Sequence, residues 1–224
     1  KRSVREVSAV LHLAGQVAVT TSLDRPTEDF EINARGTLNV LEAVRTSNPE
    51  APVVFASTNK VYGRLLDQKS VKRQDARYVP TRNELTWGIA EDAPLDFHSP
   101  YGCSKGAADQ YVTDYARVFG LRTAVLRMSC IYGPRQFGTE DQGWIAHFLL
   151  RVLHSKPIII YGDGLQVRDA LHVSDAVAAW ITVLDRIDDV SGRVFNLGGG
   201  TQNTVSLLEL IDNGDLVVFS HCGH

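Results

Sequence analysis

The sequence has little cysteine, no long apolar run and almost no excess of charge. Its three cysteines, Cys103, Cys130 and Cys222, stand in no metal-ligand spacing, and their scatter favours a reducing cytoplasm. The most apolar stretch, Ala176 to Leu184, is far shorter than the roughly 20 residues of a membrane-spanning helix. The net charge of −3 excludes a basic field that would attract nucleic acid or acidic lipid. We therefore expect no membrane, no nucleic acid and no metal among the partners.

Neither end of the chain suggests a targeting signal or a metal site. The opening residues 1–6 are followed by no apolar core of the kind that a signal peptide has. At the other end, His221, Cys222 and His224 could form a ligand trio, but an irregular chain end explains them more simply.

Short β-branched runs alternate with helical patterns, which predicts an α/β fold with a doubly wound parallel sheet. The length of 224 residues allows one large domain or one and a half. The polar stretch 64–98 is too long for an ordinary connection, and we expect a functional loop there. The expected strands are Ser8–Ala14, Pro52–Ser57, Arg122–Ile131, Lys156–Tyr161 and Arg193–Leu197, and the expected helices are Asn33–Arg45, a helix capped by Ser99 and stopped at Gly120, and Ser174–Leu184.

The later segments are short and irregular, so we expect them to form a smaller lobe over the strand ends. We assign residues 1–132 and 163–185 to a partial dinucleotide-binding domain of the Rossmann type. We assign residues 133–162 and 186–224 to a partial substrate-binding lobe.

Chemistry is expected beyond the carboxyl ends of the parallel strands, where open sheets bind their ligands. Thr58 follows one expected strand, and Tyr101 and Lys105 lie four residues apart on the next helix, hence on one face. An ammonium near a phenol lowers the pKa of the phenol, so Tyr101 could accept a proton from a sugar hydroxyl that Thr58 holds. Alone, the Tyr–Lys pair is more often a solvated helix face, and Thr58 a strand-end hydrogen-bonding residue. Their joint placement favours catalysis.

Three segments resemble the extended short-chain dehydrogenase/reductase family of nucleotide-sugar enzymes: Phe55–Gly63 (FASTNKVYG), Ser99–Lys105 (SPYGCSK) and Tyr161–Asp169 (YGDGLQVRD). Within that family, Leu95–Tyr111 and Tyr132–Trp144 are similar to epimerases that act on C2 of a CDP-linked dideoxyhexose. The likeness extends from about Val10 to Ile211.

The resemblance implies NAD as cofactor, a nucleotide sugar as substrate and a homo-oligomer as the assembled state. It implies that Tyr101 is the base, that Lys105 holds the nicotinamide ribose and tunes Tyr101, and that Thr58 binds the reacting hydroxyl. Arg168 would bind the phosphates of the substrate, although taken on its own it would more often form a surface ion pair with Asp163 or Asp169. The implied cofactor-binding residues are Leu13, Ala14, Gly15, Asn33, Ser57, Tyr101, Lys105 and Ile131.

The resemblance also separates neighbouring reactions. Dehydratases of the family carry Asp-Glu directly after the threonine, where this sequence has Asn59 and Lys60, so dehydration is not expected. Epimerisation needs only reversible oxidation of a carbinol to a ketone, with NAD regenerated in each turnover. A UDP-sugar 4-epimerase, which would use the same three residues on another carbon, and a non-catalytic sugar-nucleotide binder remain alternatives.

The sequence departs from the family pattern in its glycines. No Gly-x-Gly-x-x-Gly occurs, and Gly198 to Gly200 comes late and in the wrong spacing for a phosphate-binding turn. Residues 212–224 also look unlike the family. We therefore expect the chain to be the middle part of a longer enzyme, with a natural short form as the alternative.

Overall fold

A computed structural model describes residues 4–64, 70–82 and 85–212. Contacts divide the chain into two compact units, one of residues 1–64, 90–128 and 175–197, the other of residues 65–89, 129–174 and 198–224. The first unit is built on a four-stranded parallel sheet in the order β1 (Val10–His12), β2 (Val53–Thr58), β5 (Thr123–Met128) and β8 (Arg193–Leu197). The expected doubly wound α/β fold is confirmed.

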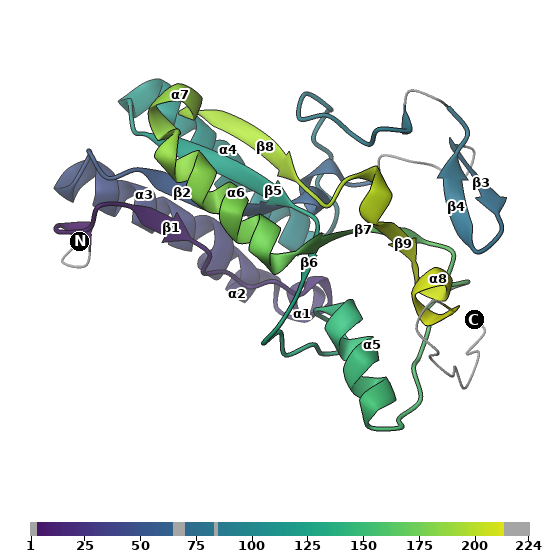
Figure 1. Cartoon of the computed structure of the whole chain (residues 1–224). Coiled ribbons are helices and arrows are strands. Elements are labelled where there is room, and N and C mark those ends of the chain that lie inside the picture. Colours follow the sequence, from purple (N-terminus) through teal and green to yellow (C-terminus); the bar gives the residue numbers. More distant parts are fainter. Residues whose placement is uncertain (1–3, 65–69, 83–84, 213–224) are drawn as a thin grey trace. The chain divides into compact units, whose positions relative to one another are not determined.

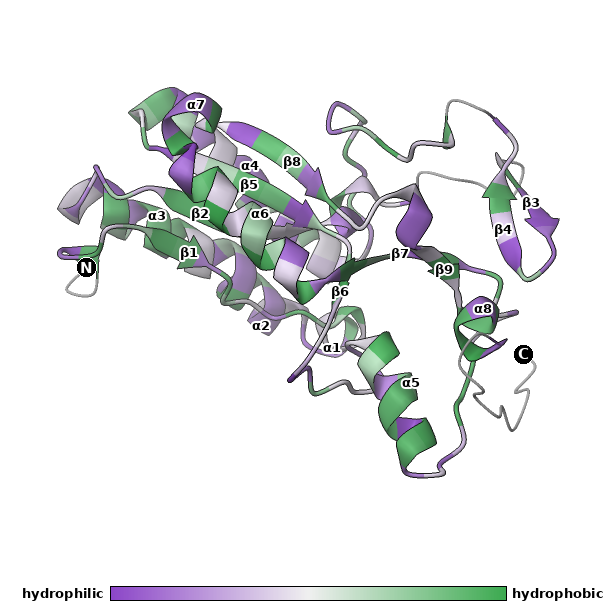
Figure 2. Ribbon diagram, viewed as in Figure 1, coloured by the Kyte–Doolittle hydropathy of each residue, from purple (hydrophilic) through white to green (hydrophobic). Residues whose placement is uncertain are grey.

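Helices cover both faces of this sheet, because alternate residues of a strand point to opposite sides. On one face, Val53, Phe55 and Val125 pack against α3 (Gly36–Ser47) and α4 (Ser99–Phe119). On the other face, Val54 and Leu126 pack against Trp180 of α6 (Val173–Asp185) and Ile187 of α7 (Ile187–Val190). Figure 1 shows α4 and α6 on opposite faces, and Figure 2 shows β2 and β5 as largely hydrophobic. The central strands are therefore buried on both sides.

Three short elements lead into α3. They are α1 (Val19–Asp24), α2 (Pro26–Phe30) and a π-helical turn, Glu31–Arg35, which replaces the first turn of the helix expected from Asn33. α4 begins at Ser99 itself, one residue before the expected start, with His98 at the N-cap; the hydroxyl of Ser99 still accepts from the Gly102 N–H at 3.2 Å. Gly120 ends the helix in the left-handed conformation, as expected. α4 is thus held at both ends.

The second unit has its own sheet and its own apolar cluster. β6 (Cys130–Tyr132) pairs in parallel with β7 (Val167–His172), which pairs antiparallel with β9 (Thr204–Ser206). Phe148 of α5 (Trp144–Leu153), Ile158, Ile160 and Ile211 of α8 (Leu207–Asp212) form the cluster. The stretch 64–98, expected as one long loop, contains a hairpin of β3 (Val71–Gln74) and β4 (Arg77–Pro80).

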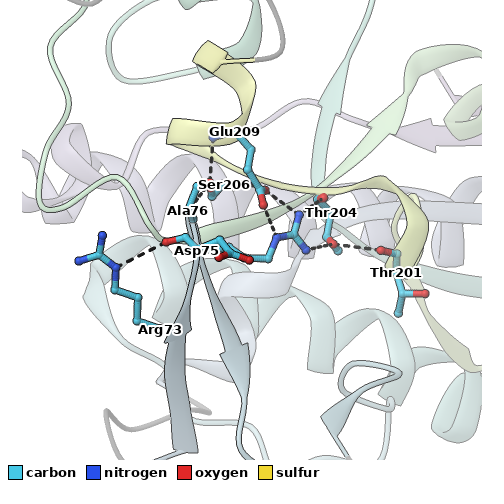
Figure 3. A network of polar contacts seen from close by, with 8 residues as sticks. Arg73, Asp75, Ala76, Thr201, Thr204, Ser206 and Glu209 are labelled. Atoms are coloured by element: carbon cyan, nitrogen blue, oxygen red, sulfur yellow. Dashed lines mark hydrogen bonds and ion pairs between the residues drawn. The ribbon is translucent and has the colours of Figure 1, made fainter.

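Arg77 connects this hairpin to the end of the described chain through Thr204 and Glu209, which are labelled in Figure 3. Its guanidinium donates two hydrogen bonds of 2.6 Å to the carboxylate of Glu209 and one of 2.8 Å to the carbonyl of Thr204. Ser206 donates to the carbonyl of Ala76 at 2.6 Å. These bonds hold β4, β9 and α8 together, and the guanidinium lowers the pKa of Glu209.

Three further sequence expectations differ from the structure. Lys156–Tyr161 is not a strand: within it Ile160 forms an isolated β-bridge, and Ile158 and Ile160 are buried in the cluster with α5 and α8. The expected strand Arg122–Ile131 is divided at Ser129 into β5 and β6, which belong to different sheets. β8 extends the parallel sheet, although the sequence division places residues 186–224 with the smaller lobe.

No described helix is both long and apolar enough to cross a membrane. Nor do the described residues contain a cluster of three His, Cys, Asp or Glu side chains that could hold a metal ion. His221, Cys222 and His224 lie outside the described residues.

Gly63 turns the chain away from the strand end that carries Thr58. Its φ of 61° and ψ of −133° lie where side chains are strained, and a Cβ there would be 1.9 Å from the carbonyl oxygen of Asp96. Gly63→Ala should therefore lower the free energy of unfolding by about 2 kcal/mol or more in denaturant titrations. Gly88→Ala is the control, because Gly88 has a φ of 93° but nothing within 4 Å. Equal losses in the two variants would show that the contact with Asp96 is unimportant.

Candidate active site

Thr58, Tyr101 and Lys105 come together at the carboxyl end of β2. Thr58 is the last residue of this strand, Tyr101 lies in the first turn of α4, and Lys105 follows one turn later. All three are buried, with at most 8% of their surface exposed. The hydroxyl of Tyr101 is hydrogen-bonded to Thr58, and the ammonium of Lys105 donates to the carbonyl of Ala56 in the same strand. The geometry places a phenol, a hydroxyl and an ammonium on one small surface.

The electrostatics of Tyr101 differ from the sequence expectation. The pKa of Tyr101 is raised above that of a free phenol, first by burial and to a smaller extent by the charge of Asp29. The hydrogen bond with Thr58 opposes these effects and lowers the pKa, as a bond to the charged form should. The expected lowering by Lys105 is wrong, because its ammonium is directed to the strand backbone and the ring of Phe55, 4.2 Å from the ring centroid.

Lys105 is a buried cation with a shifted pKa. Burial lowers the pKa to about 8, while the charges of Asp109 and Asp29 raise it in part. The ammonium in turn adds to the effect of burial on His12, whose pKa falls to about 4. His12 is therefore a neutral imidazole near pH 7, bonded through Nε2 to the hydroxyl of Thr37 at 3.0 Å.

The loop after β1 approaches Lys105 closely at Gly15. A Cβ on Gly15 would lie 3.0 Å from Oδ1 of Asn33 and 3.7 Å from Nζ of Lys105. Leu13 and Ala14 beside it are exposed. Asn33 is 1% exposed, and its amide accepts from Gln16 N–H at 2.9 Å and donates to the Gln16 carbonyl at 3.1 Å. The amide of Asn33 thus fixes the loop from within the protein.

A buried ion pair lies behind Ser57. The hydroxyl of Ser57 donates to Asp109 at 2.6 Å, and Asp109 accepts two hydrogen bonds of 2.9 Å from Arg127 in bidentate geometry. Arg127 also donates to the Tyr62 hydroxyl at 2.8 Å, which donates to Asn196 at 2.7 Å. This chain of bonds connects β2, α4, β5 and β8 beneath the site.

The groups around Gly15 suit the ribose and nicotinamide half of NAD. Lys105 offers donors, and Oε1 of Gln16 is buried without a hydrogen-bond partner among the described residues. The absence of a side chain at Gly15 leaves the backbone open at a place where a Cβ would approach both Asn33 and Lys105. The two hydroxyl groups of a ribose need hydrogen-bond donors and acceptors and a backbone that they can approach. Lys105, Oε1 of Gln16 and Gly15 provide these three features.

Two of the expected site residues belong to the second unit. Ile131 lies in β6 opposite Leu171, and its carbonyl accepts from the side chain of Gln136 at 3.0 Å. Arg168 lies in β7 and is half-buried. Within residues 4–64, 70–82 and 85–212 it forms no ion pair, since Asp163 bonds Tyr78 and Asp169 accepts from the Gly199 N–H. The surface ion pair considered for Arg168 is therefore not formed.

Two acids beside the site, Asp29 and Asp109, are not among the residues predicted from the sequence. Asp109 follows Lys105 by four residues on α4, and Asp29 precedes Asn33 by four residues. Both spacings place the acid on the same helical face as the residue already singled out, so this spacing was a usable signal. Arg127 gave no such signal, because only the packing of β5 on α4 brings it to Asp109.

The parallel sheet with helices on both faces defines an α/β protein of the doubly wound class, and comparisons with known proteins identify its family. The model of the NAD dependent epimerase/dehydratase family matches residues 2–198. The chain belongs to this family.

Individual relatives refine the comparison. The chain is 52% identical over 204 residues to CDP-paratose 2-epimerase of Salmonella typhi, which covers 89% of this chain and 60% of the relative. UDP-glucose 4-epimerase of Thermotoga maritima, solved with UDP-glucose, is 29% identical with a TM-score of 0.76, covering 92% of this chain and 59% of that one. The Thermus thermophilus UDP-glucose 4-epimerase complex with NAD is 31% identical with a TM-score of 0.74, covering 94% and 62%. The chain thus spans about 60% of the length of these proteins.

Proposed function

We propose that the protein is an NAD-dependent epimerase that inverts C2 of CDP-paratose to give CDP-tyvelose. The observation that carries this proposal is the 52% identity to CDP-paratose 2-epimerase, in a chain that also brings Thr58, Tyr101 and Lys105 together. The lower identity of 32% to a putative UDP-glucose 4-epimerase of Methanocaldococcus jannaschii favours the C2 reaction over the C4 reaction.

The three residues divide the work at one hydroxyl group. Thr58 orients the reacting alcohol and stabilises the phenolate of Tyr101 by its hydrogen bond. Tyr101 removes the proton from the alcohol and returns it after inversion. Lys105 keeps a positive charge beside the site and donates to the cofactor ribose. Lys105 and the loop at Gly15 would hold NAD, which would supply reversible hydride transfer at the carbinol carbon.

The residues after Thr58 argue against dehydration, which the resemblance links to an Asp-Glu pair at these positions. Asn59 and Lys60 occupy a 3₁₀ turn, Asn59–Tyr62, and both are exposed. Neither side chain can act as a carboxylic acid. Arg168 of β7, which no described acid neutralises, would bind the phosphates of the nucleotide sugar through its guanidinium.

The direct test supplies the full-length protein with CDP-paratose and NAD and follows the CDP-sugars by NMR. We expect CDP-tyvelose to accumulate until the two epimers reach equilibrium. UDP-glucose is the comparison substrate: turnover of UDP-glucose without turnover of CDP-paratose would replace the C2 assignment by a C4 epimerase. Calorimetry with NAD and with CDP tests the alternative of a non-catalytic sugar-nucleotide binder. If the protein binds CDP but not NAD, the proposal of an NAD-dependent epimerase is contradicted for either carbon.

A further inference from the structure

Asp29 is a buried carboxylate that the proposed mechanism does not use. It lies on α2, is 1% exposed, and forms no ion pair within the described part of the chain. Its two oxygens accept hydrogen bonds from neutral groups, one from the Asn33 amide at 3.2 Å and one from the Ser104 hydroxyl. Burying an ionised carboxylate costs free energy unless hydrogen bonds and nearby positive charge compensate. A buried carboxylate at this place therefore indicates a structural or functional role.

The two partners of Asp29 lead to the two sides of the site. Ser104 lies between Tyr101 and Lys105 on α4, and its hydroxyl also reaches the carbonyl of Tyr101 at 3.2 Å. Asn33 holds both backbone groups of Gln16, next to Gly15. One carboxylate therefore links the helix that carries the reacting phenol to the loop that approaches Lys105.

We propose that Asp29 is a positioning residue of this site: its carboxylate holds Ser104 and Asn33 in place, and its negative charge faces Tyr101 and Lys105. The role in catalysis rests on the proposed function, whereas the role in holding the loop and the charge of Lys105 does not.

The charge of Asp29 acts on both residues in the same direction. It raises the pKa of Lys105, in opposition to burial, and it raises the pKa of Tyr101, in addition to burial. Removing the charge should therefore lower both pKa values. The other charged or titratable groups around Lys105 are His12 from β1, Asp109 and Tyr101 from α4, and Arg127 from β5, which is paired with Asp109.

Asp29→Asn separates charge from shape. The side-chain carbonyl of the new asparagine can accept the hydrogen bond from Asn33. Its NH2 group can donate to the Ser104 hydroxyl, which can then donate to the Tyr101 carbonyl. Each hydrogen bond of Asp29 therefore has a replacement. We expect the titration midpoint of Lys105, followed by NMR of the labelled ε-carbon and assigned with Lys105→Met, to fall by about 0.5 to 1.5 units. Both limbs of the pH profile of kcat/KM should move to lower pH as well. Asp24→Asn, the same change at an exposed site at the end of α1, should leave the midpoint within about 0.2 unit.

Ser104→Ala tests the geometry independently and keeps the charge. We expect the Lys105 midpoint to stay where it is while NAD binding, measured by calorimetry, weakens at least about threefold, because Asn33 and the Gly15 loop lose a support. The proposal is overturned if Asp29→Asn folds and leaves the Lys105 midpoint unchanged. If Asp29→Asn does not fold, Ser104→Ala decides: unchanged NAD binding, or a shifted midpoint, contradicts the proposal.

The failure of this proposal is distinguishable from that of the proposed function. A protein that converts no CDP-sugar would still show the Lys105 shift on Asp29→Asn. If the protein is an active epimerase but Asp29→Asn leaves the Lys105 titration midpoint unchanged, the proposed function stands and the positioning role of Asp29 is contradicted.

Discussion

Tyr101→Phe is expected to reduce turnover of the nucleotide sugar at least about 100-fold in the full-length protein, because a positioned acid–base group contributes that much or more. The variant loses only the hydroxyl group and its hydrogen bond with Thr58. The backbone N–H of Tyr101 keeps its bond of 3.1 Å to the hydroxyl of Ser22, so the first turn of α4 should stay in place. The measurement is the initial rate with CDP-paratose at saturating NAD, together with the affinity for NAD.

Tyr111→Phe is the matched control for this variant. Tyr111 lies on the same helix but is exposed, so removing its hydroxyl should leave turnover within about twofold of the wild-type value. A loss of less than about tenfold in Tyr101→Phe would mean that another group moves the proton. Unchanged NAD affinity in both variants would show that the loss in Tyr101→Phe arises in the chemical step.

Arg127→Met is expected to cost about 3–5 kcal/mol of the free energy of unfolding, since removal of one partner leaves a buried charge uncompensated. Arg127 and Asp109 have 3% and 0% of their side chains exposed, and Asp109 also accepts from Ser57. Methionine fills much of the space of the arginine stem, so the loss should come mainly from the unpaired carboxylate. Urea-induced unfolding of the wild type and the variant gives the difference directly.

The same substitution on the surface provides the comparison. Arg117 pairs with Asp114 but has 80% of its side chain exposed, so Arg117→Met should cost less than about 1 kcal/mol. The double variant Arg127→Met with Asp109→Leu should recover part of the loss, because it removes both charges. Similar losses for Arg127→Met and Arg117→Met would contradict a structural role for the buried pair.

The sequence predicts the parallel sheet well because its signals are strong and local. The run Pro52–Ser57 is apolar and β-branched, and it forms β2 with a shift of one residue at each end. Ser99, Pro100 and Gly120 mark the limits of α4 by their capping chemistry. The expected strand Lys156–Tyr161 is wrong for a physical reason: isoleucines indicate burial, and Ile158 and Ile160 are buried against α5 and α8 with one isolated β-bridge at Ile160 in place of a strand.

The site is predicted in its residues but not in its electrostatics. Spacing alone places Tyr101 and Lys105 on one face, yet it does not say where a long ammonium side chain ends. Lys105 ends at the Ala56 carbonyl and the ring of Phe55, so burial governs the pKa of Tyr101. The effect of Asp29 on Lys105 depends on the packing of α2 on α4, whereas Asp109 acts from α4 itself, four residues after Lys105.

The 21-residue helix α4 has a consequence for how variants of this protein should behave. Tyr101, Ser104, Lys105 and Asp109 all belong to it, so the distances among their backbones follow from a rise of about 1.5 Å per residue. Substitutions elsewhere can tilt or slide this rod as a whole, but they do not change the intervals along it. Distant mutations should therefore shift all four residues together relative to a bound substrate. The spacing of the four residues along the helix should stay the same.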